Sequence, residues 1–183
     1  MQYKMLFLVV LFHISLAGFS KAFAQQKLGY IDSEALLIAL PEFKAAEAAF
    51  EKFQKQKQSE LEGMDKNLSS RISQYEGKYR NLSEANREVL EKELKALAAE
   101  IENLKEKLEE TSLKSQEDLA SQQEKLYAPV LEKAQLAIKA LAKEKGYSYV
   151  LDVSQPGLLF FQGEDLTPAV KEKLITNSGT AKK

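Results

Sequence analysis

The side chains that most often carry catalysis are nearly absent from this sequence. Its 183 residues contain one histidine, His13, and no cysteine. After His13, the chain therefore offers no Ser/His or Cys/His nucleophile pair and none of the usual zinc ligand sets. The glycines are isolated, so no phosphate-binding loop is present. Carboxylates are numerous, but they are spread along the faces of the expected helices and are not grouped as a catalytic pair. The sequence predicts a protein that is not an enzyme and uses no cofactor or metal.

The basic residues between positions 66 and 87 have a spacing that suggests binding chemistry. This stretch contains all three arginines of the chain, five basic residues in total, and two acids. Arginine suits bidentate contact with phosphate, and the tyrosines interleaved here suit a membrane interface. The candidate contacts with anionic lipid or lipopolysaccharide are Lys66, Arg71, Lys78, Arg80 and Arg87. The favoured alternative is a solvated surface, because charged runs usually only solvate a face.

The first 24 residues have the features of a cleaved signal peptide. A short segment with Lys4 precedes an apolar run over residues 5–19, and Ala22 and Ala24 place small residues before a cleavage point after Ala24. The run is shorter than the roughly 20 apolar residues that span a bilayer. Cleavage would leave 26 − 2 = 24 basic and 27 acidic residues, a net charge of −3. This balance does not favour a nucleic-acid partner.

The apolar spacing over residues 42–128 predicts two long helices of a coiled coil. Apolar residues recur at steps of four and three from Leu90 to Leu108, and in a similar series with one stutter from Leu61 to Leu82. Break signals follow Gly77, so we predict an antiparallel hairpin with its tip near residues 80–83. Each helix would be roughly 60 Å long at 1.5 Å per residue. One continuous helix is the alternative.

The predicted seam between these helices is thin at one level. Residues 54–60 contain no apolar side chain, and Thr111, Ser115 and Gln122 replace leucine on the returning helix. A weak seam would let the helices bend there. Ordinary variation in an exposed coiled coil explains the pattern equally well.

The two ends of the chain predict a small β-containing body. Residues 25–41 and 129–175 would form it, residues 42–128 the arm, and residues 176–183 a flexible tail. The fold class is mainly α with a small β body (α+β), in which a long helical hairpin is inserted into an oligomerisation domain. The expected elements are a strand at 27–31, helices at 34–40, 129–145 and 168–175, and strands at 148–153 and 158–162 paired as a hairpin.

A body of roughly 70 residues without a disulfide is marginally stable by itself. Oligomerisation would bury its exposed sheet edges and aromatic rings. The candidate oligomerisation residues are Leu28, Tyr30, Val150, Leu151, Leu159, Phe160 and Phe161.

Three phenylalanines mark the start of the first arm helix. Phe43, Phe50 and Phe53 are candidate contacts for apolar segments of a bound protein. The favoured alternative is that this stripe packs internally, as most apolar helical stripes do.

The body segments resemble the Skp (OmpH-like) family of periplasmic chaperones. The resemblance rests on Leu-Gly-Tyr-Ile-Asp-Ser-Glu at 28–34 with Pro-Glu-Phe-Lys at 41–44, on Ala-Lys-Glu-Lys-Gly-Tyr-Ser-Tyr-Val-Leu-Asp at 142–152, and on Asp-Leu-Thr at 165–167.

This resemblance implies a periplasmic homotrimer whose arms enclose unfolded outer-membrane proteins and prevent their aggregation without ATP. The alternative is a structural or adaptor coiled-coil protein of the cell envelope. The chain departs from the family's basic character, because residues 100–125 contain eight acids and four lysines. A uniformly positive cavity is therefore not expected.

Overall fold

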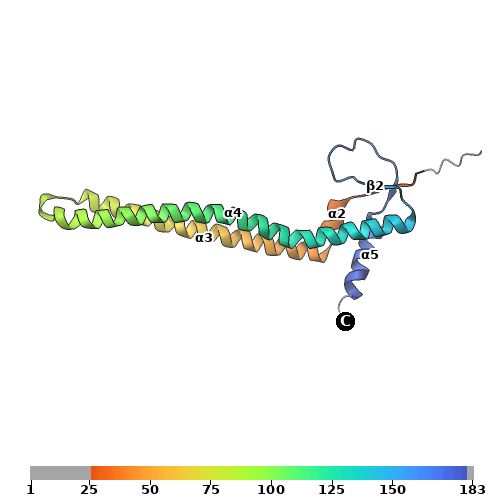
Figure 1. The fold of residues 1–183 in the computed structure, drawn as a ribbon, viewed down its shortest axis with the longest axis horizontal. Helices are drawn as coiled ribbons and strands as arrows, with labels where there is room; N and C mark the ends of the chain where they lie inside the picture. Colours follow the sequence, from red (N-terminus) through yellow and green to blue (C-terminus); the bar gives the residue numbers. More distant parts are fainter. Residues whose placement is uncertain (1–25, 181–183) are drawn as a thin grey trace, which may run out of the picture.

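A computed structural model describes residues 26–180, with side chains for residues 26–176. The expected signal peptide lies outside this range. Two long antiparallel helices extend from a small body at one end (Figure 1). In chain order the elements are β1 (Leu28–Ile31), α2 (Ser33–Ile38), α3 (Pro41–Arg80), the 3-10 helix η1 (Glu84–Asn86), α4 (Arg87–Lys145), β2 (Tyr149–Asp152), β3 (Glu164–Asp165) and α5 (Thr167–Thr180).

Helices α3 and α4 form the predicted antiparallel hairpin, which is therefore confirmed. Pro41 occupies the first turn of α3, where its missing N–H costs no hydrogen bond. The chain reverses through residues 81–86, where the Ser83 backbone N–H donates to Asn86 Oδ1 at 2.8 Å. The Asn86 side-chain amide donates to the Asn81 carbonyl at 2.9 Å. These two bonds satisfy polar groups at the helix ends and hold the tight reversal.

The separate helix expected after Pro129 does not exist. Helix α4 continues through Pro129 for 59 residues, so residues 129–145 are its last part. A proline in a helix removes one backbone hydrogen bond, and here packing on both sides of it offsets that loss. Before it, Tyr127 contacts phenylalanine rings of α3. After it, Val130 and Ala134 are buried in the body. One helix therefore connects the arm to the body.

The expected β-hairpin is also wrong. The sheet is three-stranded and entirely parallel in the order β2-β1-β3. Residues 158–162 form no strand. Strand β2 pairs with β1, from Leu28↔Tyr149 to Ile31↔Asp152, and is an edge strand of the sheet. The turn signal near Pro156 was local, whereas the pairing that prevails joins the two ends of the chain.

The core lies between the sheet and the helices. Leu36, Leu166, Val170 and Leu174 are almost completely buried. They pack with Ile31 and with apolar residues of the last part of α4. A Cβ atom added to Gly29 would lie 2.8 Å from Leu166 Cδ1, so a larger residue there would displace the buried Leu166 side chain. Helix α5 continues to Thr180, past the expected end at residue 175 and into the segment expected to be a flexible tail.

Candidate functional site

The sheet face directed away from the helices is apolar. Gly29 and Ile31 of β1 are buried on the helical side, and alternation along a strand places Leu28 and Tyr30 on the opposite side. The parallel register sets Tyr149 beside Leu28 and Leu151 beside Tyr30. Parallel sheets are normally covered on both faces. Among the described residues, only the loop after β2 lies on this one, where the Phe161 ring is 4.8 Å from the Tyr30 ring.

The same loop presents the most exposed apolar side chains of the body. Leu159 is fully exposed and Phe160 is 82% exposed. Beside them lies a groove of about 780 Å³, lined in part by Leu28, Leu151, Phe160 and Phe161. We call the sheet face and this loop the apolar sheet surface; its residues are Leu28, Tyr30, Tyr149, Leu151, Leu159, Phe160 and Phe161.

Six of the seven candidate oligomerisation residues belong to the apolar sheet surface, and Val150 does not. Val150 packs against the buried core on the helical side of the sheet. Strand alternation explains this correction, because adjacent residues of one strand face opposite sides.

The three phenylalanines of α3 lie at the start of the arm. The rings of Phe43 and Phe50 lie 5.4 Å and 6.0 Å from the Tyr127 ring of α4. The Lys57 ammonium lies 5.5 Å from the centre of the Phe53 ring. All three rings are half-buried. These contacts favour internal packing, and a role in binding another protein stays a prediction.

The basic residues near the tip are largely engaged by carboxylates. Arg71 Nε lies 3.0 Å from a Glu100 oxygen and Lys78 Nζ lies 2.5 Å from a Glu93 oxygen, both across the hairpin. Arg87 lies 4.0 Å from Glu91 on its own helix.

Arg80 Nε donates to the backbone carbonyl of Glu76 at 3.3 Å, and Lys66 is exposed. The Tyr75 and Tyr79 rings stack with centroids 6.4 Å apart. Three of the five basic side chains thus form an ion pair with a glutamate of the hairpin. Contact with lipid or lipopolysaccharide stays a prediction.

Midway along the hairpin, polar side chains occupy the seam. Ser115 is only 3% exposed, and its Oγ has no hydrogen-bond partner. Nearby, Lys57 Nζ of α3 donates to Asp118 Oδ2 of α4 at 2.6 Å. This hydrogen bond lowers the pKa of the Asp118 carboxyl and raises the pKa of the Lys57 ammonium. We call this region, residues 54–60 against 111–122, the polar seam.

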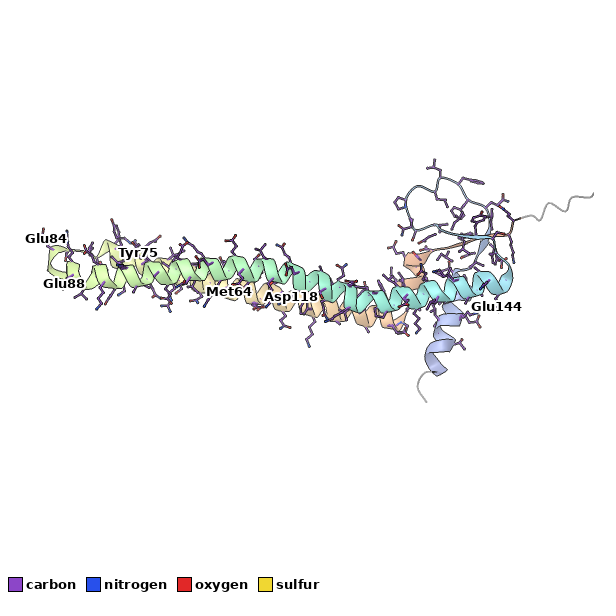
Figure 2. All side chains as sticks on the ribbon, viewed as in Figure 1. Met64, Tyr75, Glu84, Glu88, Asp118 and Glu144 are labelled. Atoms are coloured by element: carbon purple, nitrogen blue, oxygen red, sulfur yellow. The ribbon has the colours of Figure 1, made fainter. Side chains whose placement is uncertain are left out.

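A groove of about 610 Å³ lies beside the polar seam. Leu61 of α3 and Leu108 and Leu113 of α4 form its apolar part. Its charged lining consists of Glu62, Asp65, Lys105 and Glu109. In Figure 2 it lies on the stretch of arm around the labelled Met64, on the tip side of Asp118. The sequence interpretation missed this groove, although Leu113, an exposed leucine outside the heptad seam, was a signal.

The carboxylates of the body hold its elements together. Ser33 Oγ donates to Asp152 Oδ2 at 2.6 Å, and Ser154 Oγ donates to Asp152 Oδ1 at 2.8 Å. Burial opposes the charged form, but these hydrogen bonds outweigh it and lower the pKa of Asp152. At the other end of the sheet, Tyr147 donates to Glu164. Both carboxylates are thus occupied by structural partners.

The described part of the chain offers neither a cluster of metal-binding side chains nor a helix suited to a membrane. Across residues 26–180, no three or more His, Cys, Asp or Glu side chains gather in a way that could hold a metal ion. Within the same range, no helix combines the length and the apolar character needed to cross a membrane.

Comparison with known proteins finds similarity over most of the chain. A family model described as outer membrane protein (OmpH-like) matches residues 27–174. A crystal structure from Caulobacter crescentus CB15, described as that of a candidate OmpH-like outer membrane chaperone, superposes with a TM-score of 0.64. The two chains are 17% identical, and the match covers 83% of this chain and 85% of the other. At this identity the likeness shows a common fold. No curated protein sequence matches the chain.

Proposed function

Because the chain belongs to the OmpH-like family of outer membrane proteins, we propose that it is a periplasmic chaperone for unfolded outer-membrane proteins. It holds these clients between helical arms and prevents their aggregation without ATP. It performs no catalytic step and uses no cofactor. The expected signal peptide directs export across the inner membrane and is cleaved after Ala24.

The observation that carries this proposal is a long helical arm on a body whose apolar sheet face is only partly covered by a loop. The apolar sheet surface joins strand residues to Leu159 and Phe160, which are almost fully in water. Contiguous exposed apolar surface of this kind marks a protein interface. Covering it with other copies of the chain would bring several arms together, and a homotrimer would set three arms around one space.

Holding then depends on many weak contacts. Each arm offers exposed polar side chains and a few apolar ones, so a single contact is too weak to trap a client. Several arms acting together raise the effective affinity without any one strong site. A client held in this way keeps its unpaired strand edges apart from those of other clients.

Holding is tested with the processed chain, residues 25–183, and a urea-unfolded outer-membrane β-barrel. Dilution of the barrel into buffer should give a soluble complex of defined mass, and light scattering should stay low with no ATP added. A coiled-coil adaptor or spacer would leave the barrel to aggregate as it does alone. That result would remove the proposed function.

Assembly is tested on the apolar sheet surface. Leu159→Asp together with Phe160→Asp should convert the trimer into monomers in light-scattering mass measurements, because two charges would have to be buried at the interface. A control with one added charge is Ile175→Asp, at a 50% exposed position on α5. A trimer that survives the double substitution would exclude this surface as the interface.

A further inference from the structure

We propose that the groove midway along the arm binds client segments in which lysine or arginine stands next to large apolar side chains. This inference rests on the proposed holding function and specifies which part of a client the arm recognises. We call the site the acidic groove; besides Lys105 and Ser112, its lining comprises Leu61, Glu62, Asp65, Leu108, Glu109 and Leu113.

The apolar part of the acidic groove is open to water. Leu113 is 59% exposed on α4, while Leu61 and Leu108 are half-buried at the seam. Together they supply the apolar part of the groove lining, from both helices. A groove of about 610 Å³ accommodates a few side chains of an extended peptide, and its volume is within the range of small-ligand sites.

The charge around these leucines is negative. Three carboxylates and one ammonium, that of Lys105, line the groove, which gives 1 − 3 = −2. Lys105 itself lies 3.7 Å from Glu102 on the same helix. The nearby Lys57 is occupied by Asp118 at 2.6 Å. Both Lys105 and Lys57 are thus already drawn toward other carboxylates.

The lining carboxylates have no counter-ion within the described part of the chain. Glu62 accepts a hydrogen bond from the neutral amide of Gln58 at 2.9 Å, and no cationic group pairs with it. Asp65 and Glu109 form no ion pair with any residue between 26 and 176. An incoming cation therefore finds free acceptor oxygens and displaces no existing pair.

Lysine and arginine fit both parts of the groove. Their aliphatic stems pack on apolar surface while the charged head stays in water, so a stem on Leu113 can bring its head to Glu109 or Asp65. Arginine can in addition contact a carboxylate with two parallel hydrogen bonds. An acidic segment would meet like charge, and a polar basic segment would leave the leucines uncovered.

The test uses the full processed protein in its assembled form and three fluorescent peptides of equal length. One alternates Leu with Lys and Arg, one replaces the basic residues by Glu, and one replaces Leu by Ser. At low salt the first peptide should bind at least tenfold more tightly than either of the others. Added salt should weaken its binding, because the contributing charges are exposed.

A variant that lacks the three lining carboxylates tests whether the peptide binds at the groove. Glu62→Gln, Asp65→Asn and Glu109→Gln together should weaken binding of the basic apolar peptide about fivefold and remove most of its salt dependence. The matched control, Glu47→Gln with Glu84→Gln and Glu88→Gln, changes the net charge equally at exposed sites away from the groove and should change binding less than twofold. Equal effects of the two variants, or tight binding of the acidic peptide, would overturn the proposal.

A label on the groove gives an independent readout. The chain has no cysteine, so Leu113→Cys supplies a unique thiol at an exposed position. A fluorophore there should respond to the basic apolar peptide. A thiol that resists labelling in the assembled protein would show that a neighbouring copy covers the groove, which also overturns the proposal.

The holding assay distinguishes a failure of this inference from a failure of the proposed chaperone function. A protein that keeps an unfolded β-barrel soluble but shows no preference among the peptides retains the proposed function and loses the acidic groove. A protein that fails with the β-barrel loses both.

Discussion

Near the tip of the arm and midway along it, the same face of α4 meets α3 with different chemistry. Towards the tip, Leu94 and Leu97 are buried against α3. Ser115 lies 21 residues, or three heptads, after Leu94 and holds the corresponding position in the seam, buried and without a hydrogen-bond partner. At that level Lys57 and Asp118 provide the contact that leucines provide near the tip.

The difference shows that the arm is held at its ends. At the body, Tyr127 of α4 contacts Phe43 and Phe50 of α3, and near the tip the leucine seam closes the hairpin. Between them the polar seam buries less apolar surface, which is the main favourable term in packing helices. Local opening is expected where apolar contacts are few. We therefore expect the arm to bend more readily in its middle than near its tip.

Removing a leucine near the tip should have the largest effect on the difference in stability between the leucine seam and the polar seam. Leu97→Ala takes away a side chain that is 9% exposed and should lower the free energy of unfolding of the distal hairpin by about 2 kcal/mol. Amide hydrogen exchange over residues 90–108 would then become faster. Val89→Ala, at a 64% exposed position, is the control and should change exchange little. If both variants behave alike, the leucine seam does not hold the tip.

In the unmodified protein, the polar seam should exchange faster than the leucine seam. We expect amide hydrogens in residues 54–60 and 111–122 to exchange at least about tenfold faster than those in 90–108, which corresponds to about 1.4 kcal/mol. Hydrogen exchange read by mass spectrometry on peptides from each region measures this directly. Equal protection along the arm would mean that the polar seam is no weaker than the leucine seam.

Ser115→Ala should reduce the contrast by strengthening the middle. The substitution removes a buried hydroxyl that has no partner and should stabilise the polar seam by about 1 kcal/mol. Alanine also favours helix, so Ser121→Ala at an exposed position of the same helix isolates that contribution. Exchange over residues 111–122 should slow more in Ser115→Ala than in Ser121→Ala. Faster exchange there would show that the hydroxyl is satisfied.

Acid should weaken the middle selectively, by the smallest of these effects because the Lys57–Asp118 pair is partly exposed. The hydrogen bond from Lys57 lowers the pKa of Asp118 below its ordinary value of 3.8. Its stabilisation is then complete above that value and is lost as the pH falls through the lowered pKa.

Exchange over residues 111–122, corrected for the intrinsic pH dependence, should therefore rise below about pH 3.8 relative to residues 90–108. Asp118→Asn should already show the weaker middle at neutral pH and lack this added acid response. A variant with the same acid response as the unmodified protein would assign that response to another group.

The arm was predictable because its signal is local and repeated. The heptad series from Leu90 to Leu108 and the break before Ser83 indicate a hairpin without knowledge of anything outside them. The thin seam at Ser115 was visible for the same reason. The body was less predictable: the turn at Pro156 favoured a local hairpin, whereas the structure pairs β1 with β2 in parallel. Pro129 likewise favoured the end of a helix, but α4 continues through it because side chains on both sides of the proline are packed.

The candidate sites divide in the same way. Most of the apolar sheet surface could be chosen from residue type, but Val150 could not be separated from its neighbours until the strand faces were known. The acidic groove combines Leu61 and Asp65 of α3 with Leu113 of α4. Residues so far apart in the chain are adjacent only because of the register between the two helices.

By itself, the sequence determined the elements whose stabilising contacts recur at short intervals: two long helices, their reversal, and a polar interruption of their seam. Tertiary structure alone decided the parallel order of the sheet, the passage of α4 through Pro129, and the carboxylates that surround Leu113. Each of these depends on free energy gained between segments distant in the chain, and that gain exceeds the local preferences from which a sequence pattern is read.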